Sequence, residues 1–429
     1  PVATQSRSSA ASDVYKRQIL SFLINPCYCL NAMKSFLLEN HRIIALIALA
    51  SSWFLIFPSC QRNIQQDEDS GFRLDTIASP QYAGLFVAGY IHHHRAVWLK
   101  DPWDTTKIYS RFIILSHRLP NDSIPHGYQP IILPVNSIAT TSSTLISHLS
   151  SLNILDHLIG VADTSYIFHP YIRQRIHDRQ VQEIARGDRI EAESLIACRP
   201  DLSFITLYAG QDYSRFQQMG LQIVPLADYM ENHPLGRAEW IRFVGYFVGK
   251  EKEADSIFRQ IASEYSSVQK KVSHNDRPAR IFDGFMNSGV WYVSGGRSYM
   301  AQLYKDAGLS YVFSDLNETA SKGLGFEEVF SRAHDADYWR IVVSQKENFS
   351  LQDLLNLDKR YVLFESARKQ KVVVCNASHV PLYEEGVAHP ELILSDLVYL
   401  TRPELLPDYT PRYYPVSYTH LTLPTIYPV

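Results

Sequence analysis

The stretch KEKEADSIFRQIASEYSSVQKKV, residues 250–272, constrains the fold of this chain more than any other segment. Its apolar side chains have the spacing of a helix with one buried face: Ala254, Ile257, Phe258, Ile261, Tyr265 and Val268. At 1.5 Å per residue, such a helix is about 34 Å long, the width of a small domain. The preceding GRAEWIRFVGYFVG, residues 236–249, predicts a shorter amphipathic helix that ends at Gly249. We therefore expect one long, rigid helix between two separately folded halves.

Strands and helices alternate on both sides of that helix. Before it, TSSTLISHLSSL predicts a helix, LIGVAD a buried strand, ESLIAC a helix that stops before Pro200, and DLSFI and GLQIVPL two further strands. After it, ARIFDGF, VWYVSG, YWRIVVS and KQKVVVCN predict strands, and YMAQLYKDAG and GFEEVFSRA predict helices. Such alternation is typical of a parallel sheet with helices on its faces. The predicted fold class is α/β, with two lobes of central, mostly parallel sheets flanked by helices and joined by the long helix.

A region rich in predicted strands precedes the first lobe. From Phe72 to Pro134, the segments YAGLFVAGY, HRAVWLKD, YSRFIILSH and QPIILPV alternate polar and apolar residues and are separated by turns such as DPWD. We assign residues 72–232 to an N-terminal lobe with this β-rich extension, 233–273 to linker helices and 274–415 to a C-terminal lobe.

The run RIIALIALASSWFLIFPSCQ, from Arg42 to Gln61, has the composition of an export signal. Its apolar part is shorter than the roughly 20 residues of a membrane span, and it follows a basic flank as in a secretory signal. Ser59 before Cys60 resembles the cleavage site of bacterial lipoproteins, whose cysteine is lipidated. We expect a lipoprotein signal peptide over 33–60, lipidation at Cys60 and a soluble tether over 61–71. A buried core helix is the alternative.

The two ends of the chain fit no pattern that continues into their neighbours. RSSAASDVYKRQ near the start and VSYTHLTLPTIYPV at the end resemble translated adaptor or vector sequence. We expect residues 1–32 and 416–429 to be non-native, and the natural protein to run from Met33 to about Tyr414 or Pro415. A real N-terminal extension is the alternative.

Composition narrows the function. The formal net charge is −3 and no basic stripe is present, which disfavours nucleic-acid binding. Aromatic residues make up 12% of the chain, with 26 Tyr, and this is more than a core requires. Such side chains suit wet binding clefts, because one end is apolar and the other forms hydrogen bonds.

Cysteine and histidine give no metal pattern. Cys198 and Cys375 lie in different predicted lobes, so we expect two unpaired, buried thiols. The histidines of IHHHR, residues 92–94, lie on a predicted strand, where alternation keeps them from meeting at one metal. We expect neither a cofactor nor a metal ion.

Several short motifs, taken in order, resemble one family. GVADTSYIF, ESLIACRPDLSFI and GLQIVPL lie in the first lobe, and VWYVSGGRSYMAQLYKDAGLSYVF, GFEEVF and VVVCNASHVPLYEEGVAHPELILSDLVYLTRPEL lie in the second. They resemble the substrate-binding proteins of ABC importers for ferric siderophores, haem and vitamin B12, which are class III periplasmic binding proteins. The resemblance covers residues 135–414, with Cys198-Arg199-Pro200-Asp201 where the family has L-K-P-D.

The resemblance implies a function and partners. The chain would be a lipid-anchored, monomeric protein of the cell envelope that captures an iron chelate, a ferric siderophore or haem, between its lobes. It would deliver this ligand to the transmembrane subunits of an ABC permease. Cobalamin or another corrinoid is the alternative ligand, and scavenging of chelates for an outer-membrane receptor is an alternative role.

The resemblance also implies that one glutamate of each lobe docks onto arginines of the permease. Glu193 and Glu327 occupy the matching positions, and Glu328 is a neighbouring alternative to Glu327. A bidentate contact between arginine and carboxylate gives such docking its direction. The alternative is that each is an ordinary first-turn glutamate favoured by the helix dipole.

Ligands of open α/β sheets bind at the carboxyl ends of the strands. The candidate ligand-binding residues are those that follow predicted strands: Tyr166, Tyr208, Asp212, Trp291, Tyr292, Arg297, Tyr299, Asn376 and Tyr383. Aromatic walls suit a flat chelate or corrin, and Arg297 suits a negative charge on a siderophore or a propionate. Gly295 and Gly296 allow a close approach of backbone. Loop packing is the alternative role for these aromatic residues.

A two-domain α/β hydrolytic enzyme is the main alternative from another class. The chain contains no G-x-S-x-G, H-E-x-x-H or G-x-G-x-x-G sequence. We therefore predict a binding protein and not an enzyme.

Overall fold

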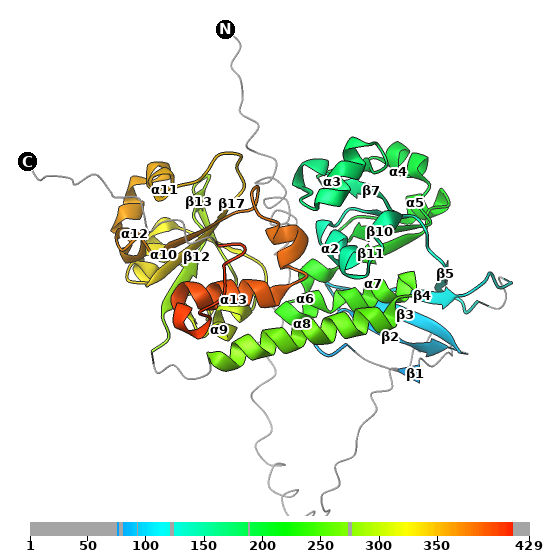
Figure 1. Cartoon of the computed structure of the whole chain (residues 1–429), viewed down its shortest axis with the longest axis horizontal. Coiled ribbons are helices and arrows are strands. Elements are labelled where there is room, and N and C mark those ends of the chain that lie inside the picture. Colours follow the sequence, from blue (N-terminus) through cyan, green and yellow to red (C-terminus); the bar gives the residue numbers. More distant parts are fainter. Residues whose placement is uncertain are drawn as a thin grey trace, which may run out of the picture.

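The structure is a computed structural model that describes residues 75–76, 80–91, 93–120, 124–187, 189–272 and 277–414. Figure 1 shows two α/β lobes with one long helix, α8, running along both of them. The predicted signal peptide, Cys60, the tether and the two ends thought to be non-native lie outside the described residues. Within the described part of the chain, no helix has both the length and the apolar character to cross a membrane.

The main sheet of the N-terminal lobe has the strand order β11-β10-β6-β7-β8-β9. The strands are β6 Ile138–Thr140, β7 Leu158–Ala162, β8 Gln182–Arg186, β9 Arg189–Ile190, β10 Leu202–Thr206 and β11 Ile223–Leu226. All neighbours are parallel except β8 and β9. The helices of this lobe are α2 Ser143–Ser151, α3 Pro170–His177, α4 Ala192–Cys198 and α5 Ser214–Gln218. The carboxyl ends of the parallel strands therefore share one edge of the sheet.

The predicted β-rich extension forms a sheet of its own, with the order β1-β2-β3-β4-β5. Its strands are β1 Asp75–Thr76, β2 Phe86–Ile91, β3 His94–Lys100, β4 Ile108–Leu115 and β5 Tyr128–Ile132. Neighbours are antiparallel except β4 and β5. One face of this sheet packs on the linker through edge-to-face aromatic pairs. The ring centroids of Phe86 and Trp240 are 5.6 Å apart, and those of Phe112 and Phe247 are 5.1 Å apart. The extension is thus joined to the core of the lobe.

The prediction of one strand through the histidines of this region is wrong, because His93 lies in a turn and only His94 begins a strand. β2 ends at Ile91, His93 has a φ of 71°, and β3 begins at His94. A left-handed residue between two antiparallel strands makes a hairpin turn. Periodicity did not predict this turn, because so short an interruption of the apolar pattern looks like the polar positions of one continuous strand.

The linker consists of α6 Pro234–Ala238, α7 Trp240–Val248 and α8 Glu251–Lys271. The predicted long helix is confirmed: α8 has 21 residues and covers about 31 Å. Its buried residues are Ala254, Phe258, Ile261 and Tyr265, all within the predicted stripe. A Cβ on Gly245 of α7 would lie 2.7 Å from that of Ala254, so α7 and α8 pack closely where this glycine permits it.

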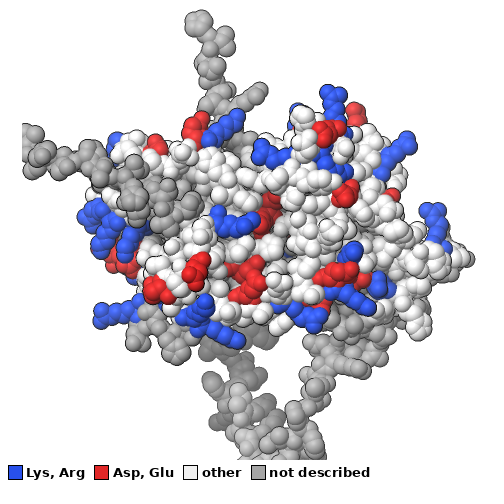
Figure 2. All heavy atoms as spheres, in the orientation of Figure 1, with Lys and Arg blue, Asp and Glu red and all other residues white. Residues whose placement is uncertain are grey.

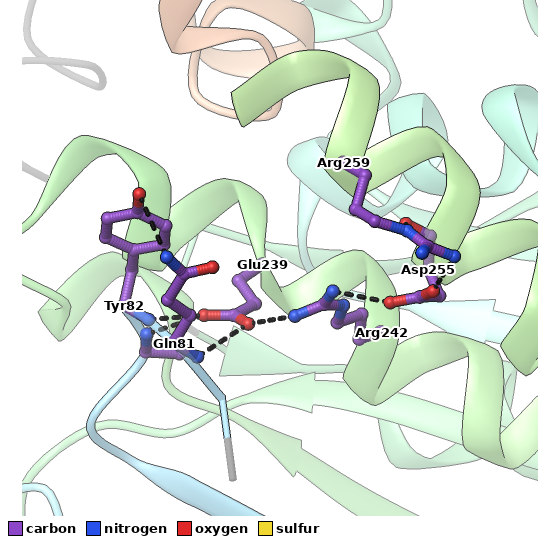
Figure 3. A network of polar contacts seen from close by, with 7 residues as sticks. Gln81, Tyr82, Glu239, Arg242, Asp255 and Arg259 are labelled. Carbon is purple, nitrogen blue, oxygen red and sulfur yellow. Dashed lines mark hydrogen bonds and ion pairs between the residues drawn. The ribbon is translucent and has the colours of Figure 1, made fainter. Parts of the chain in front are cut away.

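The predicted single helix over 236–249 is wrong, because the structure divides it at Glu239. The carboxylate of Glu239 is completely buried and accepts three backbone N–H groups, from Gln81 at 2.9 Å, Tyr82 at 2.7 Å and Ala83 at 2.9 Å (Figure 3). Arg242 pairs with Glu239 and also with Asp255 of α8. This network fastens the chain before β2 to both linker helices, although the partners are more than 150 residues apart.

A buried carboxylate holds the other end of the described chain in the same way. Asp396 of α13 (Pro390–Thr401) accepts the backbone N–H groups of Arg412 at 2.9 Å, Tyr413 at 2.6 Å and Tyr414 at 3.0 Å. Asp396 is fully buried, so these charge-assisted bonds replace its hydration.

The C-terminal lobe has a parallel sheet in the order β15-β12-β17-β18 and a small antiparallel sheet, β13-β14-β16. The strands are β12 Arg280–Asp283, β13 Met286–Asn287, β14 Val290–Val293, β15 Ser310–Tyr311, β16 Lys322–Leu324, β17 Tyr338–Val343 and β18 Val372–Asn376. The helices are α9 Tyr299–Asp306, α10 Phe326–Ala333, α11 Leu351–Leu357, α12 Glu365–Arg368 and α13. Cys375 is fully buried and Cys198 is half-buried, and both are free thiols.

Candidate ligand-binding site

The carboxyl ends of the N-terminal strands carry a pair of tyrosines. Tyr208 follows β10, and Tyr229 lies in the short helix Asp228–Met230 that follows β11. Their ring centres are 5.9 Å apart, and the hydroxyl of Tyr229 donates to the carbonyl of Leu207 at 2.7 Å. Both rings are half-buried, so they offer aromatic surface at the edge where ligands of such sheets bind.

Arg237 of α6 connects this tyrosine pair to the other lobe. Its guanidinium donates to the carbonyls of Tyr229 at 2.6 Å and Glu231 at 2.9 Å, and it lies over the ring of Tyr299 with 4.3 Å to the centroid. Tyr299 begins α9 of the C-terminal lobe. A cation over an aromatic face is attracted to it, more strongly where water is excluded. Arg237 thus places a positive charge where the two lobes meet.

Charge and burial are coupled around Arg237. Burial raises the pKa of Asp228, and the nearby Arg237 offsets only part of this effect, so the net pKa is raised. Burial also raises the pKa of Tyr299, so its phenol stays neutral at any physiological pH. The Tyr299 hydroxyl is buried and has no hydrogen-bond partner among the described residues.

A second contact between the lobes comes from the π-helical turn Leu382–Gly386, which follows β18. The backbone carbonyl of Tyr383 accepts the hydroxyl of Thr144 in α2 at 3.0 Å. The carboxylate of Glu384 accepts the backbone N–H of Phe168 at 2.7 Å. Burial raises the pKa of Glu384, while the N–H groups of Phe168 and His169 lower it.

A cavity of about 400 Å³ opens along the seam behind this turn. Its polar lining comes from both lobes: Ser147, Ser150, Ser151 and His169 from one, and Glu384, Glu385, His389 and Arg412 from the other. Figure 2 shows acidic and basic side chains interspersed over this face of the molecule, without a large patch of one sign. In the described part of the chain, no cluster of His, Cys, Asp or Glu side chains forms a metal site.

The structure places three of the nine predicted ligand residues, Tyr208, Tyr299 and Tyr383, at the meeting of the lobes, and Tyr166 in the loop beside it. Tyr208 and Tyr299 are linked through Tyr229 and Arg237. Tyr166 ends the turn after β7, two residues before Phe168, and is half-buried. Tyr383 is 50% exposed, so it presents surface beside the interlobe contact.

Trp291 does not belong to this set, and its predicted role in the cleft wall is wrong for this arrangement. It is 0% exposed, donates its indole N–H to the carbonyl of Asp283 at 2.9 Å and packs against Trp339 and Phe364. A fully buried indole has no surface for a ligand. The prediction assumed that Trp291 follows a strand of the main parallel sheet. It lies instead on β14 of the small sheet β13-β14-β16, and its side chain is part of the core.

Asn376 and Asp212 organise their own loops. The side-chain amide of Asn376 donates to the carbonyl of Gln345 at 2.9 Å and its oxygen accepts the Gln345 N–H at 3.3 Å, which joins two loops after neighbouring strands. Asp212 is exposed and accepts the N–H and hydroxyl of Ser214 at the start of α5, both at 2.8 Å. Short polar side chains commonly serve turns in this way.

Tyr292 and Arg297 lie on the rim of the C-terminal lobe. Tyr292 is half-buried on β14, and Arg297 is exposed with its backbone N–H on the carbonyl of Glu318 at 3.1 Å. Gly295 and Gly296 do allow a close approach of backbone, but the approaching group is another segment of the same chain and not a ligand. A Cβ on Gly295 would lie 2.2 Å from the Glu318 carbonyl oxygen, and one on Gly296 2.4 Å from that of Leu316.

Both candidate docking glutamates are exposed on the first turn of a helix, Glu193 in α4 and Glu327 in α10. α4 leads to the start of β10 and α10 to the start of β17, so both helices begin on the carboxyl-edge side of their sheets. The carboxylate of Glu327 is 3.9 Å from Arg360, a distance too long for a strong ion pair. Each carboxylate is thus accessible to a partner.

Sequence reasoning missed Arg237. It lies near the start of the predicted linker helix 236–249, and the apolar spacing of that helix does not distinguish it from the other polar residues there. Its positive charge at the start of the predicted linker was the one available signal.

The sequence profile described as periplasmic binding protein matches residues 138–378, more than half of this chain. The chain belongs to the periplasmic binding protein family. Two relatives from Methanocaldococcus jannaschii, described as uncharacterised lipoproteins, are 24% and 22% identical over 294 and 305 residues. The matches cover 66% and 69% of this chain, and 69% and 77% of the relatives.

Solved structures of periplasmic binding proteins have the same fold. The haem-binding RhuT of Roseiflexus sp. RS-1 gives a TM-score of 0.52 at 16% identity, over 63% of this chain and 99% of that one. The haem-binding HutB of Vibrio cholerae gives 0.52 at 14%, over 62% and 99%. A protein of the Fe³⁺-hydroxamate transport system of Saccharomonospora viridis gives 0.51 at 15%, over 66% and 98%. The predicted class III fold is confirmed, and the family is one of solute-binding transport proteins rather than enzymes.

Proposed function

We propose that this periplasmic binding protein is the extracytoplasmic component of an ABC importer that captures an iron chelate, a ferric siderophore or haem, between its lobes. The observation that carries the proposal is the guanidinium of Arg237, which donates to the backbone carbonyl of Tyr229 in one lobe and lies over the ring of Tyr299 in the other. The named ligands of structures with this fold, haem and Fe³⁺-hydroxamate, support the choice of chelate.

The chemistry of this arrangement suits a large anionic chelate. Tyrosine rings provide flat apolar surface together with a polar edge. An arginine forms directional bonds to carboxylates such as haem propionates and stacks on aromatic planes. Arg297 and Tyr292 on the opposite rim, and Tyr166 and Tyr383 beside the seam, would complete the walls. Cobalamin, which carries neutral amide side chains, would make less use of Arg237.

Delivery requires a site for the permease and a place at the membrane. Glu193 and Glu327 would dock on arginines of the permease, since both are exposed and both begin helices on the carboxyl-edge side of their sheets. Lipidation of Cys60 would hold the protein at the envelope membrane. Two relatives described as lipoproteins support this anchor.

A spectroscopic titration tests the ligand class. Purified protein is titrated with haemin, a ferric trihydroxamate and cyanocobalamin, and quenching of intrinsic fluorescence is followed together with the visible band of each compound. We expect one iron chelate to bind with a stoichiometry of one, and Arg237→Gln to weaken its binding about tenfold or more, the effect of losing a charged hydrogen bond. Glu404→Gln, an exposed change in the C-terminal lobe, is the control and leaves affinity unchanged. Tight binding of cyanocobalamin alone would favour the corrinoid alternative, and binding of none of the three would contradict the proposal.

A further inference from the structure

We propose that Glu384 is a positioning residue that latches the two lobes together along one flank of the crevice, and that this latch must open for a ligand to enter. The part that concerns ligand entry rests on the proposed function. The latch itself is a property of the protein without ligand and is tested separately.

The latch is a contact between distant parts of the chain. Glu384 belongs to the C-terminal lobe, yet its carboxylate accepts the N–H of Phe168 in the N-terminal lobe at 2.7 Å. The neighbouring Tyr383 carbonyl accepts the Thr144 hydroxyl at 3.0 Å. Glu384 is only 5% exposed, so a buried charge spans the seam and depends on the opposite lobe for its hydrogen bond. Buried charges are stable only when they are paired or hydrogen-bonded.

The turn that carries Glu384 is braced firmly on its own lobe. The next residue, Glu385, accepts Nε of Arg412 at 2.8 Å and the hydroxyl of Tyr413 at 3.2 Å. Asp396 in turn holds the backbone of residues 412–414. The turn therefore moves with the C-terminal lobe. Single π-helical turns occur often at functional sites, which agrees with a specialised role here.

On the N-terminal side, the latch grips the loop that leads from the predicted ligand residues. Phe168 lies two residues after Tyr166 and directly before His169 and Pro170, where α3 begins. Opening the contact frees the backbone of this loop. The latch thus connects the relative position of the lobes to the position of Tyr166.

The contact is built to open. A cavity of about 400 Å³ adjoins it, lined by Ser147, Ser150 and Ser151 of α2 and by Glu384 and Glu385 of the turn, so part of the surface between the turn and α2 is polar and open. In the linker, in contrast, Phe258, Ile261 and Tyr265 of α8 are buried, and α8 runs along both lobes (Figure 1). Opening the latch breaks the hydrogen bonds that Glu384 and the Tyr383 carbonyl accept from the N-terminal lobe, while the linker core stays intact. Small rotations about the linker are therefore the accessible motion.

Hydrogen exchange at the Phe168 amide measures the latch directly in the full chain without ligand. Removal of a hydrogen bond to a charged group shifts an equilibrium by about tenfold or more. We therefore expect Glu384→Ala to speed exchange of this amide about tenfold. Glu384→Gln keeps the volume of the side chain and a weaker hydrogen-bond acceptor. Its exchange rate at Phe168 should therefore lie between those of Glu384→Ala and the natural protein. Glu404→Ala, exposed in the same lobe, is the control and leaves the exchange rate unchanged.

Stopped-flow mixing with haemin and with a ferric trihydroxamate tests the role of the latch in ligand entry. If the latch must open for entry, association should be fastest for Glu384→Ala. The rates for Glu384→Gln and the natural protein should then follow in the same order as their exchange rates at Phe168. Unchanged exchange at Phe168 in both Glu384 variants would overturn the latch, and unchanged association despite faster exchange would overturn its role in entry. If neither probe binds, the proposed function fails, while the exchange rates still decide whether the latch exists.

Discussion

Tyr265 of α8 donates a hydrogen bond of 2.6 Å from its phenol to the carboxylate of Asp306, at the end of α9 in the C-terminal lobe. Both side chains are buried, and Gln269, one turn further along α8, reaches the other oxygen of Asp306 at 2.8 Å. At its opposite end, α8 is tied to the N-terminal lobe by the ion pair between Glu251 and Arg95. The helix is therefore fixed to each lobe by polar contacts as well as by its apolar stripe, and it acts as a strut between them.

The bond between Tyr265 and Asp306 should contribute measurably to stability. Tyr265→Phe leaves the buried Asp306 carboxylate with one donor fewer, and we expect the free energy of unfolding in urea to fall by about 1–3 kcal/mol. Tyr171→Phe is the matched control, since Tyr171 also bonds an aspartate, Asp156, but is 45% exposed. The control should change stability by less than about 0.5 kcal/mol. An equal loss of unfolding free energy in the two variants would contradict the prediction that the bond between Tyr265 and Asp306 contributes more than an exposed one.

Glu239 should be among the most sensitive polar positions in the described chain. Glu239→Gln removes a buried charge that serves three backbone N–H groups, and it leaves Arg242 without that partner. Breaking a buried pair from one side costs about 3–5 kcal/mol. Chemical denaturation checks this against Glu253→Gln, an exposed first-turn position of α8 whose side chain pairs with Lys250. A loss for Glu239→Gln no larger than that of the control would contradict the assigned role of this network.

His148 should make the protein less stable as the pH falls. Burial, with a smaller effect of the facing His389, lowers the pKa of His148 to about 3. The unfolded chain has a pKa near 6.5 at this residue, so below about pH 6 the unfolded state takes up a proton that the folded state refuses. The free energy of unfolding then falls by up to about 1.4 kcal/mol per pH unit towards pH 3.

His389 has the opposite effect and must be separated from that of His148. Burial lowers the pKa of His389, but the Glu391 carboxylate at 2.9 Å and the nearby Glu385 outweigh it, and the net pKa is raised, while Arg412 opposes them. Its contribution is present below about pH 6.5 and is lost as the pH rises through its raised pKa. Urea unfolding of His148→Gln across about pH 4 to 7 separates the two effects. In this variant the pH dependence of the free energy of unfolding that His148 causes is lost, while that of His389 remains. Parallel curves for the variant and the natural protein would contradict the prediction.

The docking glutamates should matter for transport and not for binding. Glu193→Ala combined with Glu327→Ala removes two exposed carboxylates that lie outside the tyrosine and arginine cluster, so chelate affinity in the titration should stay unchanged. Uptake of labelled chelate by cells that depend on this protein should be lost. Glu404→Ala, exposed in the C-terminal lobe, is the control and should retain uptake, and Glu328→Ala decides between Glu327 and its neighbour on the same turn of α10. Loss of chelate affinity in the double variant would refute the docking role.

Periodicity predicted the parts of this fold that bury a continuous stripe or alternate along a strand. The helix α8, the parallel strands of both lobes and the β-rich extension are of this kind. The break at Glu239 and the bonds of Arg237 are different, because each depends on a single polar side chain whose partner lies far away in the sequence or in the other lobe. Such contacts leave no periodic signal. Trp291 shows the same limit, since a strand end indicates an edge of a sheet but does not show what covers that edge.

Native mass spectrometry of the protein purified from its own host tests the central claim most directly. The account predicts one bound iron chelate per chain, seen as a single mass increment with the isotope pattern of iron, and its loss or strong reduction in Arg237→Gln at unchanged folding. An empty protein under iron-limited growth, or a bound molecule without iron that Arg237→Gln retains, would contradict it.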